Sequence, residues 1–353
     1  SGQRVPKGQG HALGASRCRR CRVDGDGHLG VATWPVVQMG TAVTEGPGGI
    51  IEARLDSAHD LAALLSALQL REKDQKDQRV HCEASSRGLK FVAQSGGKDV
   101  AVLGWMFCNA FKEYRYTFAA EEVHLRLPVA PLLSCLQIFS DRAAMALRYP
   151  HGPSEELYFT LEEEGAITEC RLKTLVLDEA PQPMGSFFAP GDPLSMFRPT
   201  QAEAWHLALS EFAEFDAPDV VLYLTLRSAG SPAAPAVVLR AQTVTNDAEV
   251  ELPRAAFEEH ELCPEAAAVG EVTHCYLLSG VLASCLRAAR DAKAVKVRFN
   301  AEGVMSNQFI LRGRGQRDLF CEALVSPLAE AARTAGPPAK RRAYAAGGES
   351  IGF

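Results

Sequence analysis

Two short motifs near the start of the chain contain residue types that bind metal ions. Cys18 and Cys21 form one half of a zinc motif, but no second pair of cysteines or histidines follows at a usable distance. Asp24 and Asp26 resemble the start of a calcium-binding loop, in which Pro35 occupies the place of the bidentate carboxylate. Neither motif is complete, so the sequence predicts no metal site here.

The other residues suited to catalysis are isolated or adjacent rather than convergent. Glu162, Glu163 and Glu164 precede Gly165, which is typical of a hairpin tip, and three adjacent carboxylates cannot all face one pair of metal ions. We find no nucleophile elbow, phosphate-binding loop or dinucleotide fingerprint. Single histidines occur at His59, His81, His124, His206 and His274. We therefore expect no enzyme activity, no cofactor and no metal.

Basic residues give a stronger indication. Arg287, Arg290 and Lys293 follow at three-residue steps, which predicts that they share one face of a helix around 282–289. Such a face can follow DNA phosphates without contacting bases, and an ordinary solvated helix surface is the alternative. A second candidate is the basic cluster after the first predicted helix, formed by Arg71, Lys73, Lys76 and Arg79.

The basic helix belongs to a segment that the chain carries twice. Ser134-Cys135-Leu136 recurs as Ser284-Cys285-Leu286, and 145–149 recurs as 295–299, both displaced by 150 residues (284 − 134 and 295 − 145). This period exceeds the roughly 20–50 residues of a solenoid repeat, so it predicts two copies of a whole domain. In the first copy the equivalents of the three cations are neutral, and Arg142 is the nearby basic residue.

Apolar periodicity predicts the elements of the first domain, 50–176. A strand at 50–55 is followed by a helix that Asp56 or Ser57 caps. A second helix over 131–141 follows Pro128. Further strands are predicted from alternation and turn signals at 80–83, 89–93, 100–103, 114–118, 123–127, 145–149, 157–161 and 166–172.

The second domain, 194–328, repeats this pattern. Thr200 and Glu203 predict a Thr-x-x-Glu capping box ahead of a helix that carries Trp205. Strands are predicted at 220–226, 236–242, 274–278, 295–299, 307–311 and 319–324. The fold class is therefore α+β, with two tandem domains in which two helices back antiparallel sheets.

Composition limits the class of protein. A length of 353 residues suits about two domains, and 47% hydrophobic with 23% charged residues is ordinary for a globular core. No apolar run reaches the roughly 18 residues of a transmembrane helix. Ten scattered cysteines fit reduced thiols in an intracellular protein better than disulfides. The net charge of −6 does not exclude nucleic acid, because a basic surface can face phosphates on an acidic protein.

Both ends of the chain differ from the domains. We expect residues 1–49, rich in glycine and arginine, to be a disordered or extraneous leader, and the first methionine is Met39. The tail 329–353 is expected to be disordered as well. Its basic run, Lys340-Arg341-Arg342, is a short candidate for nuclear targeting.

Five segments of the first domain carry a family signature. They are Leu70-Arg71-Glu72, Gly88-Leu89-Lys90, Phe111-Lys112-Glu113-Tyr114, Leu132-Leu133-Ser134-Cys135-Leu136-Gln137-Ile138-Phe139 and Leu161-Glu162-Glu163-Glu164-Gly165-Ala166-Ile167-Thr168-Glu169-Cys170. With the two tandem domains, they resemble the sliding-clamp fold of PCNA, and within it the Rad-one-type subunits of the nine-one-one DNA-damage checkpoint clamp. The resemblance rests on motifs over about 50–175 and on pattern alone over 194–326.

The resemblance implies a heterotrimeric ring that this chain forms with two paralogous clamp subunits, one copy of each. A replication-factor-C-like loader would place the ring on double-stranded DNA with recessed ends, in the nucleus, where it would promote checkpoint signalling and repair. In such rings helices line the hole and neighbours pair edge strands. By this analogy Arg287, Arg290 and Lys293 face DNA, and the first-domain edge lies near 124–126 or 145–149.

Two segments qualify the resemblance. The proline-rich linker 177–193 occupies the place where clamps receive partner peptides, so Met184, Phe187 and Phe188 are candidate peptide contacts. The predicted helix after Thr200 is acidic, with Glu203, Glu211 and Glu214. Either these carboxylates turn away from the hole, or this subunit contributes little to the grip on DNA.

Two other functions remain as alternatives. A 3′–5′ exonuclease, an activity sometimes attributed to the family, requires several carboxylates around paired metal ions. The spacing of aspartates and glutamates does not predict such a group. A homotrimeric processivity clamp would instead associate with itself and need no paralogue.

Overall fold

The computed structural model describes residues 49–70, 78–151, 156–174, 188, 192, 194–215, 219–228, 230–244, 246–313 and 318–328. The predicted tail with its basic run, and the leader up to residue 48, lie outside these residues. No helix of the described residues is long and apolar enough to cross a membrane.

The described chain contains one order of elements twice. The first copy consists of β1 (Ile51–Leu55), α1 (Ala58–Ala67), β2 (Arg79–Ser85), β3 (Gly88–Gln94), β4 (Val100–Phe107), β5 (Glu113–Tyr116), β6 (Glu122–Pro128), α2 (Val129–Leu136), β7 (Ala144–His151), β8 (Glu156–Glu163) and β9 (Ala166–Lys173). The second consists of β10 (Ser195–Pro199), α3 (Ala202–Ser210), β11 (Val221–Arg227), β12 (Pro235–Gln242), β13 (Asp247–Pro253), β14 (Phe257–Glu261), α4 (Pro264–Val269), β15 (Glu271–Leu277), α5 (Leu278–Asp291), β16 (Ala292–Phe299), β17 (Met305–Arg312) and β18 (Asp318–Val325). Apart from α4, the two copies match element for element, and the predicted duplication is confirmed.

Antiparallel pairing joins the described strands into three sheets. Their orders are β5-β1-β7-β8-β9, β14-β10-β16-β17-β18-β4-β3-β2-β6 and β13-β12-β11-β15. The nine-stranded sheet combines five strands of the second copy with four of the first, through the pair β18 and β4. The order β14-β10-β16-β17-β18 corresponds to the five-stranded sheet β5-β1-β7-β8-β9 of the first copy. The order β4-β3-β2-β6 corresponds to the four-stranded sheet β13-β12-β11-β15 of the second copy. The counterparts of β18 and β4 are therefore β9 and β13, and both are sheet edges.

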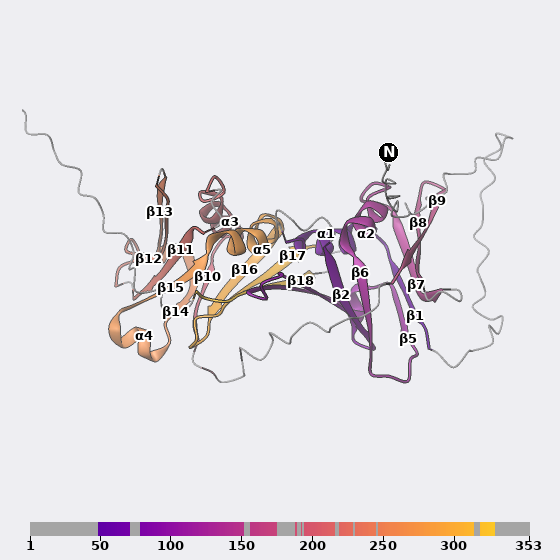
Figure 1. Ribbon diagram of the computed structural model, residues 1–353, viewed down its shortest axis with the longest axis horizontal. Helices are drawn as coiled ribbons and strands as arrows, with labels where there is room; N and C mark the ends of the chain where they lie inside the picture. Colours follow the sequence, from indigo (N-terminus) through magenta and orange to yellow (C-terminus); the bar gives the residue numbers. More distant parts are fainter. Residues whose placement is uncertain are drawn as a thin grey trace, which may run out of the picture.

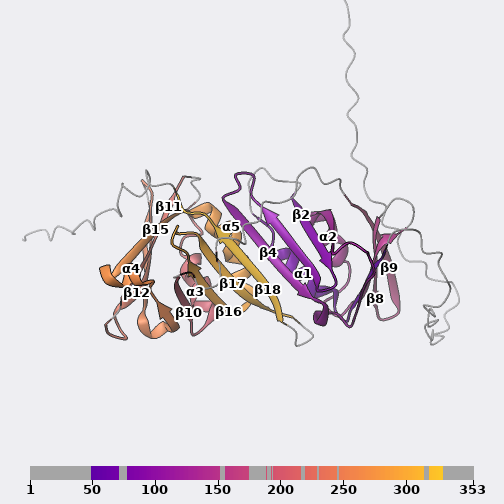
Figure 2. The same ribbon diagram turned by 90° about the horizontal axis from the view of Figure 1, so that it is seen from below.

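The helices lie together on one side of the sheets. In Figure 1, α3, α5, α1 and α2 form a row, and α5 contacts both α3 and α1. Figure 2 shows the nine-stranded sheet from its other side. Gly104 in β4 permits close packing of α1, because a Cβ at this position would come within 2.9 Å of Leu64 Cδ1. The row of helices thus spans both copies of the domain.

Local sequence explains where two of these helices run. The Ser57 side chain accepts a hydrogen bond from the His59 backbone N–H over 3.2 Å, so Ser57 caps α1 as predicted. In α5, Leu278, Val281, Cys285 and Ala288 are buried at helical spacing, and this stripe packs on the sheet.

A cluster of aromatic rings fills the core of the second copy. Phe197 lies 5.2 Å from Trp205 and 5.3 Å from Phe257, measured between ring centroids, and both pairs are edge to face. The Trp205 indole N–H donates to Asn307 Oδ1 over 3.2 Å, and both residues are fully buried. This bond fixes α3 to β17.

Two sequence predictions about the helices are wrong. The second helix is Val129–Leu136 rather than 131–141, because tertiary contacts hold the chain after it: the Ser140 N–H donates to Glu163, and the Asp141 carbonyl accepts from Ser57. The capping box does not form, since the Thr200 hydroxyl donates to the Ala256 carbonyl instead.

Of the two alternatives predicted for the sheet edge of the first domain, one lies at an edge and the other does not. The segment 145–149 lies in β7, which pairs with β1 and β8 on its two sides, so it is interior. The segment 124–126 lies in β6, which ends the nine-stranded sheet. The second copy pairs its strand β18 with β4 of the first copy. The strand of the first copy that corresponds to β18 is β9, which is a second sheet edge.

Candidate nucleic-acid interface

Of the three cations predicted on one helix face, Arg287 lies between the two copies of the domain. Its guanidinium donates to the Ser66 backbone carbonyl over 2.9 Å and to the Gln69 side-chain oxygen. Both acceptors lie at the C-terminal end of α1, where backbone carbonyls lack helical partners and attract cations. Arg287 is half-buried and ties α5 to α1.

Arg290 and Lys293 are exposed, but each pairs with a carboxylate. Arg290 donates to both oxygens of Asp291 over 2.9 Å, and these bonds raise the pKa of the guanidinium. Lys293 pairs with Asp318 at the start of β18. The prediction that Lys293 shares the helix face is wrong, because α5 ends at Asp291 and Lys293 belongs to β16.

A groove of about 1130 Å³ crosses the helix side of the molecule. Its walls come from one face of α1, the N-terminal half of α3, the C-terminal end of α5, the segment after α2, the start of β16 and the end of β17. The charged or titratable residues that line it are His59, Asp141, Glu203, His206, Arg290, Asp291, Lys293 and Arg312. Three carboxylates face three arginine or lysine side chains, so the groove is close to neutral.

The acidic residues of α3 and its C-terminal turn stay on the helix side. Glu203 lines the groove, and Glu211 is exposed where α3 ends. The carboxylates therefore do not turn into the core, and two of the basic residues beside them, Arg290 and Lys293, are already paired. This arrangement favours a weak grip on phosphates over a strong one.

The other predicted basic residues are divided between described and undescribed positions. Arg142 is exposed in the turn after α2, and Arg79 is exposed at the start of β2. Arg71, Lys73 and Lys76 lie outside the described residues.

The outer side of the nine-stranded sheet carries the end of the predicted peptide-binding linker. The Phe188 ring lies over the Arg298 guanidinium, 4.7 Å from its carbon, and packs beside Trp105. Arg298 also donates to Glu322 over 3.0 Å. Phe188 thus packs on its own chain across the junction of the two copies. Met184 and Phe187 lie outside the described residues.

One cluster on the same outer side was not predicted. His81 and Glu83 in β2 lie beside His124 in β6. In the part of the chain that the structure describes, they form the group of three side chains that could hold a metal ion, and only one member is a carboxylate. The spacing His-x-Glu and the strand over 123–127 were visible in the sequence, but the pairing of that strand with β2 was not.

The sequence matches a family that fits this architecture. Residues 50–311 match the family described as repair protein Rad1/Rec1/Rad17. The chain belongs to the Rad1/Rec1/Rad17 family. No curated protein that we compared with this Rad1-family chain matches it.

Solved structures show that the Rad1-family chain has the sliding-clamp fold. The proliferating cellular nuclear antigen of Entamoeba histolytica superposes with a TM-score of 0.60 at 12% identity, over 79% of this chain and 99% of that one. The PCNA2–PCNA3 complex of Sulfolobus tokodaii gives a TM-score of 0.58 at 12% identity, over 78% of this chain and 98% of the other. The predicted fold class and family are both confirmed.

Proposed function

We propose that this chain is a non-enzymatic subunit of a heterotrimeric ring that encircles DNA and acts in the DNA-damage checkpoint and in repair. Two paralogous clamp subunits complete the ring in a one-to-one-to-one assembly. A replication-factor-C-like loader places it on double-stranded DNA with recessed ends. The family match and the clamp fold support this proposal.

The free edges β9 and β13 carry the proposal. Inside the chain, β18 pairs with β4 across the junction of the two copies. Their counterparts β9 and β13 lie at opposite ends of the described structure, and no further described strand pairs with their outer sides. An open edge is an aggregation hazard unless it is covered. Neighbouring subunits of the same fold would cover both edges by repeating the β18–β4 pairing.

Side chains on these edges are suited to contact with a neighbour. Ile167 in β9 is 51% exposed and offers an apolar contact at this edge. Arg171 and Lys173 follow on the same face of β9. Asp247 and Glu251 are exposed on β13. Apolar and charged contacts of this kind add specificity to backbone pairing between strands.

The helix row faces the DNA in this proposal, and its near-neutral groove implies few phosphate contacts from this subunit. Most of the grip would then come from the paralogues. Topological enclosure does not require tight contact, and few contacts favour sliding over static binding. We propose nuclear localisation on the basic run Lys340-Arg341-Arg342.

The alternatives differ in their support. The exonuclease has none among the described residues, where no group of carboxylates suits a pair of metal ions. A homotrimer has one observation in its favour: the cations Arg171 and Lys173 of β9 and the carboxylates of β13 also suit two copies of this chain. The composition of the ring therefore has to be measured.

Release from DNA tests whether the ring encloses it. The reconstituted trimer is loaded by its clamp loader onto gapped circular DNA, which provides a recessed end, and washed at high salt, and the DNA is then cut once with a restriction enzyme. An enclosing ring stays on the circle and leaves within minutes of the cut. Equal retention on cut and uncut DNA would contradict enclosure.

A further inference from the structure

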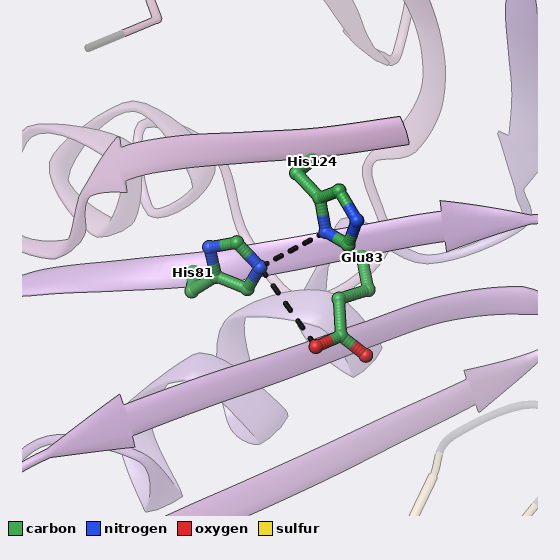
Figure 3. A group of neighbouring side chains, drawn as sticks. All are labelled: His81, Glu83 and His124. Atoms are coloured by element: carbon green, nitrogen blue, oxygen red, sulfur yellow. Dashed lines mark hydrogen bonds and ion pairs between the residues drawn. The ribbon is translucent and has the colours of Figure 1, made fainter. Parts of the chain in front are cut away.

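The cluster of His81, Glu83 and His124 lies on the outer side of the sheet, away from the helix row (Figure 3). His81 and Glu83 are two residues apart in β2, so their side chains leave the same face. His124 in β6 lies directly opposite Glu83 in the antiparallel register. Two imidazoles and a carboxylate are thus brought together by one strand pair.

The donor atoms of these side chains converge on one point. His81 Nε2 is 3.1 Å from His124 Nδ1 and 3.8 Å from Glu83 Oε1, and the ligand atoms all lie within 4.8 Å of one another. Two nitrogens bound tetrahedrally to zinc at about 2.0–2.1 Å would be separated by about 3.3 Å. The observed spacing is close to this value without any rearrangement of the strands.

Burial restricts the ring of His81, and a hydrogen bond orients Glu83. His81 is 6% exposed, and its other ring nitrogen, Nδ1, has no hydrogen-bond partner among the described residues. The Lys90 ammonium donates to Glu83 Oε2 over 2.6 Å, which orients the carboxylate and leaves Oε1 toward His81. A supporting contact of this kind is typical of carboxylates that bind metals.

We propose that His81 Nε2, His124 Nδ1 and Glu83 Oε1 bind a divalent transition-metal ion, with zinc as the expected occupant. Two imidazoles and one carboxylate are a ligand set that zinc accepts, with a fourth position left for water or for a donor from another molecule. Because His124 is exposed, the ion would reach the site directly from solvent.

The bound ion would connect the edge strand β6 to β2 through side chains in addition to the backbone ladder. Lys90 faces Glu83 from β3, and Arg126 lies opposite His81 in β6. These two positive charges weaken cation binding, so the site should bind zinc less tightly than a four-ligand structural site. A direct hydrogen bond between the two imidazoles is the competing explanation of the short nitrogen–nitrogen distance.

Cobalt(II) titration of the full chain tests the site. The two cysteines at 18 and 21 are replaced by serine in all samples, which removes the other candidate ligands that the sequence offers. One equivalent of cobalt should produce the visible absorption of four-coordinate cobalt without the near-ultraviolet band of a thiolate complex. His124→Ala should abolish the visible band and lower the affinity for zinc, measured by competition with a chromogenic chelator, by at least about 100-fold.

Two controls keep the result interpretable. His151→Ala removes another imidazole, which stacks on Tyr158, and should leave the cobalt spectrum unchanged. The circular dichroism of His124→Ala should equal that of the parent chain, because His124 is exposed. Absence of the cobalt band in the parent, or an unchanged zinc affinity in His124→Ala, would overturn the proposal and leave the imidazole hydrogen bond.

Discussion

The Arg287 guanidinium donates to the Ser66 carbonyl over 2.9 Å, from the last helix of the second domain copy to the first helix of the first copy. The two residues are 221 positions apart in the sequence. A cation that periodicity placed on the DNA-facing surface therefore also holds the two copies together. A charge reversal at this position would mix an effect on stability with any effect on DNA.

Alanine at position 287 measures the contribution of Arg287 to stability without introducing a negative charge. Arg287→Ala should lower the free energy of unfolding by about 1.5–3 kcal/mol, because it removes charge-assisted hydrogen bonds to the end of α1. Arg290→Ala, at an exposed position that pairs only locally, should change it by less than about 0.5 kcal/mol. Urea denaturation followed by circular dichroism measures both. Equal effects of the two variants would show that the contact between α5 and α1 is not stabilising.

The acidic edge β13 is expected to govern assembly. Asp247→Lys with Glu251→Lys should weaken association with the neighbouring subunit by about 5–30-fold, since like charges across paired strands cost about 1–2 kcal/mol in total. Analytical ultracentrifugation with the paralogous subunits measures this. The matched control, Glu121→Lys with Glu122→Lys, makes the same charge change at the start of β6 and the residue before it. If only the control weakened association, the interface would lie at β6 and the proposal that β13 forms it would be wrong.

Cys135 is expected to be the reactive thiol of the repeated segment. A hydrogen bond from Cys170 lowers the pKa of Cys135 to about 7, whereas burial raises the pKa of its counterpart Cys285 to about 12. Alkylation of Cys135 by iodoacetamide should therefore rise as pH passes 7 and then level off, while Cys285 stays unmodified in the folded chain. Peptide mass spectrometry measures both sites. With Cys170→Ala the midpoint should move toward 9, and an unmoved midpoint would contradict the assignment of the donor.

The groove on the helix side should contribute little to DNA retention. Arg290→Glu with Lys293→Glu and Arg312→Glu is expected to reduce retention of the loaded ring by less than about 10-fold, because Asp291 and Asp318 already offset two of these charges. Glu203→Lys should increase retention and serves as the change of opposite sign. Complete loss of retention in an intact ring of the triple variant would show that this subunit grips DNA strongly.

Much of the fold was predictable, and the exceptions have physical reasons. Strands with a buried face, such as β8 and β16, alternate clearly in the sequence. The strand β13 was not predicted, although polar and apolar residues alternate over 247–252; it is an edge strand without a buried residue. The strand β10 was not predicted either; it has five residues and directly follows a proline-rich stretch.

The candidate sites were less predictable than the elements that carry them. Periodicity identified the face of α5 that bears Arg287, but it gives no information on what lies opposite that face. Likewise, the register that places His124 beside Glu83 joins strands 41 residues apart, and hydrophobic patterns alone do not specify which strands pair. The surroundings of Arg287 and the position of His124 both depend on contacts between segments that are distant in the sequence.

The mass of the purified chain in solution, alone and after co-expression with paralogous clamp subunits from the same source, tests the central claim most directly. Multi-angle light scattering measures it. We expect a monomer that becomes a one-to-one-to-one trimer with the two paralogues. A homotrimer of the chain alone, or a monomer that associates with none of the paralogues, would contradict the account.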